Sequence, residues 1–215
     1  MKKHTEKTID NGKNGKCINL KKHKIIREKL KKSFVGIAGA GGLGSNVAES
    51  LARAGVGKIL IVDFDKVEES NLTRQFYFRN QIGMIKVDAL KENILKIDEK
   101  INILTLNKRL IFGSMHKPFS DVDVIVEALD DAETKTNFVE DVSKNLKNIP
   151  LVSCSGVSGY GNIDRISTKK LGNLYFVYDK YAKESDEDVL TAPRISLLAN
   201  WQANIVLEIL LGEDK

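Results

Sequence analysis

Cysteine and histidine are scarce in this chain of 215 residues, and each shortage excludes a class of protein. The two cysteines, Cys17 and Cys154, are too few for a disulfide framework or for a zinc site of the CxxC…CxxC type. The three histidines, His4, His23 and His116, show no spacing that could replace such zinc ligands. We therefore expect no zinc site.

Long apolar runs are also missing. No stretch stays apolar over the roughly 20 residues that a bilayer-spanning helix needs. The amino terminus is rich in lysine and lacks the apolar core of a signal peptide. These absences predict a cytoplasmic protein without membrane contact. The length allows one large domain with a sizeable core, which we prefer to two small ones.

Acidic residues are few only at the amino terminus. Residues 1–32 hold twelve Lys or Arg against three Asp or Glu, whereas residues 33–215 hold 22 against 26, so the net charge of +5 belongs to the first segment. Residues 1–22 lack apolar periodicity and predict a disordered tail, followed by a short helix over residues 23–32. Contact of the tail with nucleic acid or a membrane surface is the alternative, but no aromatic residues alternate with the lysines, which argues against a stacking platform for bases. The expected organisation is a basic tail over residues 1–32 and one domain over residues 33–215.

The most informative stretch of the chain begins at Phe34. Phe34–Ala38 is an apolar run typical of a buried parallel strand, and it ends at Gly39-x-Gly41-x-x-Gly44, where a helical pattern begins. Glycines permit a tight turn and a close backbone approach, so phosphate oxygens can reach the free N–H groups at the positive end of the helix dipole. The turn, which includes Gly42, predicts a nucleotide site. The alternative is a strand-to-helix turn that binds nothing.

Polar residues follow the second predicted strand, Lys58–Val62. Asp63 stands about as far from the glycines as the acidic residue that binds ribose hydroxyls in dinucleotide-binding folds. The next stretch is too rich in charges and amides for an ordinary crossover, and Arg74 could neutralise phosphate charge through its fork of donors. The residues predicted to lie beside a nucleotide here are Asp63, Asp65, Asn71, Arg74 and Gln75.

Three sequence strings resemble those of a known family. They are GAGGLGSNVAESLARAGVGKILIVDFD, VEESNLTRQ and GMIKVDALKENI. In combination they resemble the ThiF/MoeB/HesA adenylyltransferases, which activate small ubiquitin-like sulfur carriers and are related to ubiquitin-activating enzyme. The resemblance covers roughly residues 33–211 and is greatest to the short ThiF type of thiamine biosynthesis.

The resemblance implies a reaction and its residues. ATP would adenylate the carboxyl-terminal glycine of a ThiS-like carrier ending in Gly-Gly, with release of pyrophosphate. Longer relatives place a reactive cysteine in or beyond the crossover segment, and this chain has none after Cys154, so we expect a separate protein to donate sulfur. Lys86, at the start of a predicted helix, would grip the ATP phosphates, and Asp130 would bind magnesium. Arg74, Lys86 and Asp130 are thus the predicted catalytic residues, and a homodimer is implied. Two alternatives remain open: Lys86 as a solvated surface lysine, and Asp130 with Asp131 as caps of the following helix.

The remaining pattern completes an α/β fold. Apolar runs predict further strands at Ile101–Leu106, Val122–Ala128 and Ile149–Val152, and antiparallel strands at Ile163–Thr168 and Leu174–Tyr178. Helical spacing of apolar residues fills the connections. We therefore predict a Rossmann-like, doubly wound, mostly parallel sheet with an antiparallel extension.

Three other functions share parts of this pattern. An NAD-dependent oxidoreductase shares the glycine turn and Asp63, but it does not explain Arg74, Lys86 and Asp130 around a triphosphate. A related enzyme that activates a carboxylate on RNA, of the tRNA-modifying dehydratase type, shares the whole ATP site, and the basic tail would suit it. A non-catalytic scaffold would bind a carrier without ATP turnover.

Overall fold

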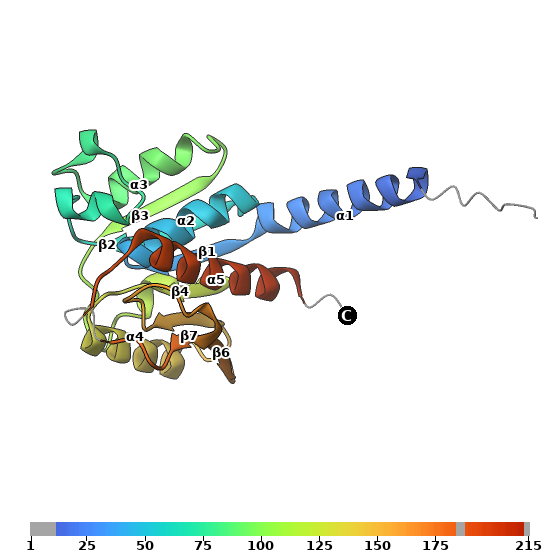
Figure 1. Cartoon of the computed structure of the whole chain (residues 1–215). Helices are drawn as coiled ribbons and strands as arrows, with labels where there is room; N and C mark the ends of the chain where they lie inside the picture. The colour runs from blue at the N-terminus through green and yellow to red at the C-terminus, as the bar shows by residue number, and fades with distance from the viewer. Residues whose placement is uncertain (1–11, 184–187, 213–215) are drawn as a thin grey trace, which may run out of the picture.

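The computed structural model describes residues 12–183 and 188–212, with side chains from Lys22 onward (Figure 1). Its centre is a seven-stranded sheet with the order β3-β2-β1-β4-β5-β7-β6. The strands are β1 Phe34–Ala38, β2 Lys58–Asp63, β3 Asn102–Asn107, β4 Val124–Glu127, β5 Leu151–Ser155, β6 Ile166–Leu171 and β7 Leu174–Asp179. All neighbouring pairs are parallel except β6 with β7, which confirms the predicted fold class.

The strand register aligns the ends that carry the predicted site. Ala38, the last residue of β1, pairs with Val62 of β2 on one side and with Glu127 of β4 on the other. Parallel strands finish at one edge of a sheet, so the segments that follow these three strands meet there. The continuous apolar sequences of β1 and β4 suit strands that are covered on both faces.

Helices cover both faces of the sheet (Figure 1). One face carries α2 Gly42–Ala54, α3 Lys86–Leu95 and α5 Ala192–Leu211, whose apolar residues share one buried cluster with the sheet. The other face carries α4 Ala132–Asn145 and the short η3 turn Lys117–Phe119, where Phe119 and Phe138 pack edge to face. The remaining short 3-10 turns are η1 Glu69–Thr73, η2 Arg79–Gln81 and η4 Ile163–Arg165.

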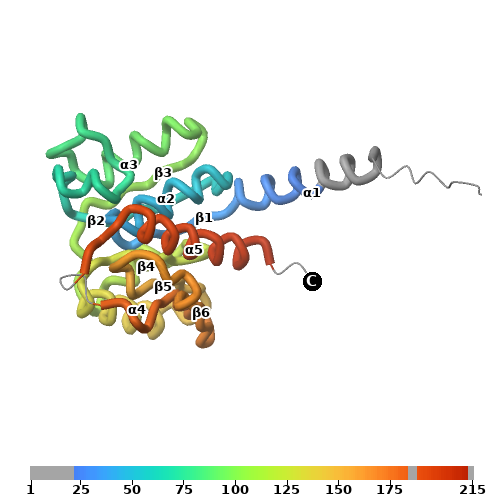
Figure 2. The backbone as a smooth tube through the Cα atoms, in the orientation of Figure 1, coloured from blue at the N-terminus to red at the C-terminus, as the bar shows by residue number. Residues whose placement is uncertain are grey.

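The amino-terminal helix is longer than the sequence predicts. The helix α1 spans Gly12–Lys32, whereas we expected disorder up to residue 22 and a helix only from His23. Leu30 is fully buried, and the Lys29 ammonium donates to the Leu211 carbonyl, which places α1 beside the end of α5 (Figure 2). Once these turns are fixed, each further helical residue adds a backbone hydrogen bond without a new nucleation cost. Residues 1–11 lie outside the described part of the chain.

The second half of the sheet also differs in detail from the prediction. The predicted antiparallel pair exists, but β6 begins at Ile166 because Asn162 adopts a left-handed conformation and Ile163–Arg165 form η4. In addition, β7 lies inside the sheet and pairs in parallel with β5, so only β6 runs against the other strands. Among the residues that the structure describes, no helix is long and apolar enough to cross a bilayer.

Candidate active site

The glycine turn after β1 depends on two close backbone approaches. Gly39 has a φ of 97°, and a Cβ atom there would lie 2.5 Å from the Ala128 carbonyl oxygen. A Cβ at Gly44 would lie 1.9 Å from the carbonyl oxygen of Gly39, so only glycine lets the first turn of α2 pack on the loop. Gly41 caps α2 without any side-chain hydrogen bond, which leaves the helix amides and their dipole for an anion.

Asp63 lies at the end of β2 as predicted, and it holds the glycine turn. Its Oδ2 accepts the Ala40 N–H at 2.6 Å, and its Oδ1 accepts the Asp65 N–H at 2.8 Å. Each carboxylate oxygen keeps a second lone pair that a ribose hydroxyl could use. The predicted ribose ligand therefore also organises the backbone around the site.

Lys86 is buried and paired, so it is not the solvated lysine of the alternative reading. Its side chain is 8% exposed, and its ammonium lies 3.0 Å from Oδ2 of Asp65. Its backbone N–H also donates to the Asp65 carbonyl, which joins the start of α3 to the segment after β2. Asp65 is half exposed, so the pair faces the edge of the sheet, where a phosphate could compete for the ammonium.

Three predicted residues sit on the loop around η1, in different roles. Asn71 is buried, and its Oδ1 accepts the Glu68 N–H, which closes the 3-10 turn. The Arg74 guanidinium donates to the Ser70 carbonyl at 3.0 Å, so it rests on its own turn. Gln75 lies over the glycine turn, with its Nε2 4.0 Å from the Cβ position of Gly41 and with a buried Oε1 that has no partner. An unpaired buried carbonyl beside the turn is a group that a ligand could satisfy.

Sequence reasoning missed residues that tie this loop down. The Tyr77 hydroxyl donates to the Ala40 carbonyl inside the glycine turn at 2.7 Å, and the side chain is buried. Burial, together with the nearby Asp63 and Asp65 carboxylates, raises the pKa of the Tyr77 phenol. The Asn46 amide donates to the Arg74 carbonyl, linking α2 to the same loop. Only the three aromatic residues in succession at positions 76–78 could have signalled a buried anchor here.

Asp130 and Asp131 have separate roles at the end of β4. Asp131 is the cap of α4, since its Oδ2 accepts the Thr134 N–H at 2.7 Å, and hydrogen bonds from Thr134 lower the pKa of the Asp131 carboxyl. Asp130 is exposed, and its Oδ1 accepts the Asp131 N–H at 3.0 Å. The capping alternative therefore applies to Asp131, while Asp130 keeps an oxygen for a ligand.

The exposed Asp130 carboxylate suits a magnesium ion that takes its other ligands from a bound substrate. Mg²⁺ is commonly held by one or two carboxylates together with substrate phosphates, rather than by an all-protein cage. Within the described residues no three His, Cys, Asp or Glu side chains gather as a metal site. Asp130 would thus hold the metal jointly with ATP phosphates, with the donor chemistry that a hard cation prefers.

Sequence reasoning also missed a buried network of charged and polar side chains at the end of β4, beside the loop that carries Asp130. Glu127 is fully buried at the end of β4, and its carboxylate accepts from the Lys135 ammonium at 2.9 Å and from the Ser153 hydroxyl at 2.6 Å. The Gln202 amide of α5 donates to the Glu127 carbonyl. Only residue types that are rarely buried, placed at the end of an apolar strand, could have signalled it.

The glycine-rich segment after β5 packs on the crossover to α5. The Gly159 N–H donates to the Val189 carbonyl, and the Ser158 hydroxyl donates to the Lys183 carbonyl. Arg194 of α5 forms a buried ion pair of 2.6 Å with Asp179. A pocket of about 290 Å³ lies at this end of β5 and β7. Its lining residues are Ser155, Gly156, Phe176, Tyr178, Asp179, Lys180, Ala182 and Lys183.

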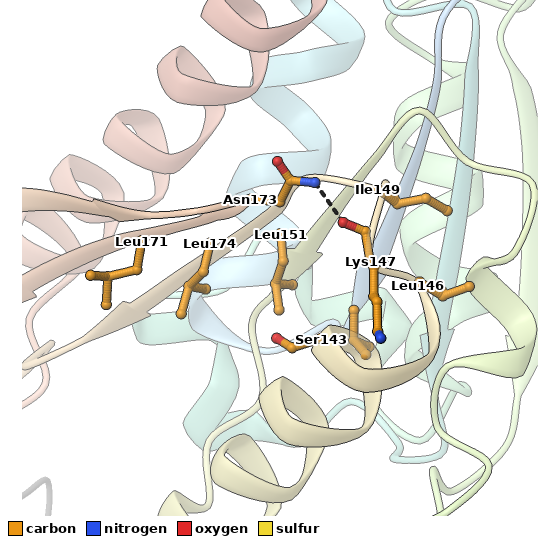
Figure 3. Close-up of a pocket in the computed structure, with 9 residues that line it drawn as sticks. Ser143, Leu146, Lys147, Ile149, Leu151, Leu171, Asn173 and Leu174 are labelled. Carbon is orange, nitrogen blue, oxygen red and sulfur yellow. Dashed lines mark hydrogen bonds between the residues drawn. The ribbon is translucent and has the colours of Figure 1, made fainter.

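A second pocket, of about 220 Å³, lies at the opposite edge of the sheet (Figure 3). It is formed by the end of α4, the start of β5 and the β6–β7 hairpin, where the Asn173 amide donates to the Lys147 carbonyl. Leu151 and Leu174, which line it, point from the strands toward α4 (Figure 3). None of the predicted site residues borders it.

Of the two cysteines, Cys154 is the one whose side chain the structure describes. Cys154 is fully buried on β5, and burial raises the pKa of its thiol to about 12. His116 contacts Asp141 of α4 at 3.1 Å. This contact holds the loop between β3 and β4 against α4.

Fold and site together define a doubly wound α/β domain with a glycine turn after its first strand and carboxylates at the same edge. The chain belongs to the ThiF family, whose model matches residues 16–215. This confirms the family that the sequence strings indicate.

Individual relatives differ in what their names describe. The chain is 33% identical over 191 residues to the adenylyltransferase and sulfurtransferase UBA4 of Saccharomyces cerevisiae, covering 86% of this chain and 43% of that protein. It is 36% identical over 134 residues to the tRNA threonylcarbamoyladenosine dehydratase of Bacillus subtilis, covering 61% of this chain and 52% of that protein. The chain thus spans about half the length, or less, of these relatives.

Solved structures share the fold. The E. coli tRNA N6-threonylcarbamoyladenosine dehydratase TcdA in complex with ATP superposes with a TM-score of 0.80 at 20% identity, covering 92% of this chain and 93% of that one. E. coli MccB with ATP gives a TM-score of 0.69 at 22% identity, covering 94% of this chain and 64% of that one.

Proposed function

We propose that the protein is an ATP-dependent adenylyltransferase that activates the carboxyl-terminal glycine of a small ubiquitin-like sulfur carrier. The observation that carries this proposal is that the segments after β1, β2 and β4 finish at one sheet edge with four features: the start of α2 without a side-chain cap, the Asp65–Lys86 pair, Arg74 and Asp130. Two cations, helix amides and a carboxylate suit a nucleoside triphosphate with its metal. A dinucleotide without a γ-phosphate would leave much of this set unused.

The reaction needs positioning and charge neutralisation rather than a protein nucleophile. A carboxylate oxygen of the carrier attacks the α-phosphorus of ATP, the bond to the β-phosphate oxygen breaks, and pyrophosphate leaves with that electron pair. Lys86 and Arg74 neutralise charge that grows on the phosphate oxygens. Asp63 holds the ribose, and Asn71 and Gln75 shape the nucleotide's surroundings. Magnesium, held by Asp130, would supply further charge neutralisation.

Arg74 and Lys86 both have to change partners for this role. Arg74 now donates to the Ser70 carbonyl, a neutral acceptor, and Lys86 donates to Asp65. For Arg74, a polyphosphate offers a stronger, charge-assisted hydrogen bond than the Ser70 carbonyl does. For Lys86, a polyphosphate competes with the Asp65 carboxylate, which is already a charge-assisted partner, by offering several anionic oxygens to the ammonium. This change of partners involves only rotation of the two side chains. The backbone stays in place, since Asn46 holds the Arg74 carbonyl and the Asp65 carbonyl holds the Lys86 N–H.

The test is ATP–pyrophosphate exchange that depends on a carrier ending in Gly-Gly. Exchange in the presence of a ThiS-like protein, and none without it, is the expected result. A carrier that lacks its last glycine is the matched control. Binding of NAD(H) without any exchange would instead favour the oxidoreductase alternative. A pull-down of a small protein ending in Gly-Gly, or the genomic neighbours, would test the proposed place in thiamine biosynthesis.

A second candidate function is activation of a carboxylate on tRNA. Two observations favour it: the similarity to the Bacillus subtilis dehydratase, and the charge of α1, which has nine Lys or Arg and one Glu. Such a helix suits a phosphate backbone. Exchange assays with carrier and with tRNA, run in parallel, separate the two candidates.

We also propose that the protein is a homodimer, which light scattering of the purified protein would test.

A further inference from the structure

Leu129, the residue before Asp130, has both of its backbone polar groups held by one buried ion pair. Its N–H donates to Oε1 of Glu127 at 2.8 Å, and its carbonyl accepts from the Lys135 ammonium at 2.8 Å. The same ammonium lies 2.9 Å from Oε1 of Glu127. The two peptide groups on either side of Leu129 are thus fixed by the Glu127–Lys135 pair.

The pair is itself held from several sides. Glu127 Oε2 accepts the Ser153 hydroxyl of β5 at 2.6 Å, and the Glu127 carbonyl accepts from Gln202 of α5. Lys135 belongs to the first turns of α4, and its side chain is 17% exposed. Two elements, β5 and α4, therefore contact a carboxylate that is fully buried, and α5 holds the backbone carbonyl of the same residue.

The loop that the pair holds lies against the glycine turn. The Ala128 N–H donates to the Ala38 carbonyl at 2.8 Å, and the Ala128 carbonyl fills the space where Gly39 lacks a side chain. The loop is consequently fixed on one side by the glycine turn and on the other by Glu127 and Lys135. Asp130 follows directly, so the direction of its Cα–Cβ bond depends on the fixed peptide after Leu129.

We propose that Glu127 and Lys135 are positioning residues that aim the Asp130 carboxylate at the metal–phosphate end of the nucleotide. The inference rests on the proposed function, because it assigns Asp130 to magnesium–ATP. Stability alone does not call for such a pair, since buried ion pairs are often no more stabilising than apolar side chains of similar volume. The contacts of this pair, in contrast, go to the backbone of one loop residue.

The test compares how strongly magnesium tightens ATP binding, measured by calorimetric titration with magnesium and with EDTA. The main variant is the double change Glu127→Gln with Lys135→Met, which avoids leaving one charge buried alone. We expect the magnesium enhancement of ATP affinity to fall by roughly 10-fold, the scale of a lost residue that orients a metal ligand. ATP affinity in EDTA should stay near that of the parent.

Two further variants sharpen the result. In an Asp130→Asn background the double change should have no additional effect on the enhancement, because both act through one carboxylate. Asp141→Asn is the matched control: Asp141 is a buried carboxylate of α4 that accepts the Met115 N–H at 2.7 Å and does not touch the Asp130 loop. It should lower the melting temperature and leave the enhancement unchanged.

The possible failures are distinguishable. A full magnesium enhancement in the Glu127→Gln, Lys135→Met variant, beside a reduced one in Asp130→Asn, would overturn the positioning role alone. If the double variant does not fold, the single change Ser153→Ala, which frees one side of Glu127, is measured in its place and should lower the enhancement in the same direction. A parent protein that binds no ATP would overturn the proposed function and this inference together.

Discussion

The two halves of the sheet's carboxyl-terminal edge are built differently. Beyond β2, β1 and β4, polar side chains fix backbone groups, as the partly buried Asp63 and the buried Tyr77 and Glu127 do. Beyond β5 and β7, backbone pairing and the buried side chains of Ser158 and Arg194 hold the glycine-rich segment, but Tyr160 (77% exposed) and Ile163 (64%) face solvent. The first half suits a small ligand of fixed shape, and the second suits a larger partner that brings its own apolar surface.

The largest effect we expect comes from a methyl group in the first half. Gly44→Ala places a Cβ 1.9 Å from the Gly39 carbonyl oxygen, so either α2 or the glycine turn must move. We expect loss of ATP binding and a lower melting temperature, measured by calorimetric titration and thermal unfolding.

Gly41→Ala is the matched control for this change. The nearest atom to its new Cβ is Nε2 of Gln75 at 4.0 Å, so the fold should persist. Equal melting temperatures for Gly44→Ala and the parent would contradict the view that the first half is rigid.

The next effect concerns the two cations. Arg74→Ala and Lys86→Ala should each slow acceptor-dependent pyrophosphate release by roughly 10²-fold, because in the proposed reaction both neutralise charge that grows in the transition state. Arg79→Ala is the control, since the Arg79–Glu69 pair is exposed on both sides and contributes little. Near-parental rates in both test variants would remove these residues from the chemistry.

Sequence alone could predict the first half because its chemistry is carried by residue types at short spacing. The glycine turn, Asp63 and Lys86 follow one another within one βαβ unit and the loop after it, and each lies at the predicted edge. The anchors were missed because their partners are distant in sequence: Tyr77 bonds Ala40, and Glu127 bonds Ser153, 26 residues away. Such contacts depend on strand register and helix packing, which periodicity does not specify.

The second half was predicted less well for a related reason. Alternation indicates that a segment is a strand but not which neighbour it joins, so the parallel pairing of β7 with β5 was not foreseen. The start of β6 depends on the left-handed Asn162, which few sequence patterns specify. In α1, the helical residues that precede His23 depend on packing of the last turns of the helix rather than on local sequence.

A smaller effect tests the second half as an acceptor surface. Tyr160→Ala and Ile163→Ala should raise the KM for a protein acceptor by roughly 10-fold each, the scale of an interface contact, and leave ATP affinity unchanged. Leu171→Ala is the control: Leu171 is 55% exposed but lies at the opposite end of β6, beside the pocket in Figure 3. Equal rises in KM for all three variants would remove the distinction between the two halves.

The smallest effect is expected at the cysteines. Cys154 lies on β5, next to β4 of the first half, yet its thiol is fully buried and has its pKa raised to about 12. A thiolate is the nucleophile, so this thiol should not attack an acyl-adenylate near neutral pH. We therefore propose that the chain stops at the acyl-adenylate and that a separate protein donates sulfur. A Cys17→Ser, Cys154→Ala variant should retain carrier-dependent ATP–pyrophosphate exchange, and the parent should form no thiol-labile carrier adduct on a non-reducing gel.

The raised pKa of Cys154 also affects stability. The thiol ionises near pH 9 in the unfolded chain and near pH 12 in the folded one, so the stability that the protonated thiol contributes is lost as the pH rises between these values. The melting temperature of the variant should therefore fall less steeply with rising pH than that of the parent over this range. A parent adduct that disappears in the variant would instead make one of the cysteines a nucleophile and would join the two halves in one sulfur-transfer site.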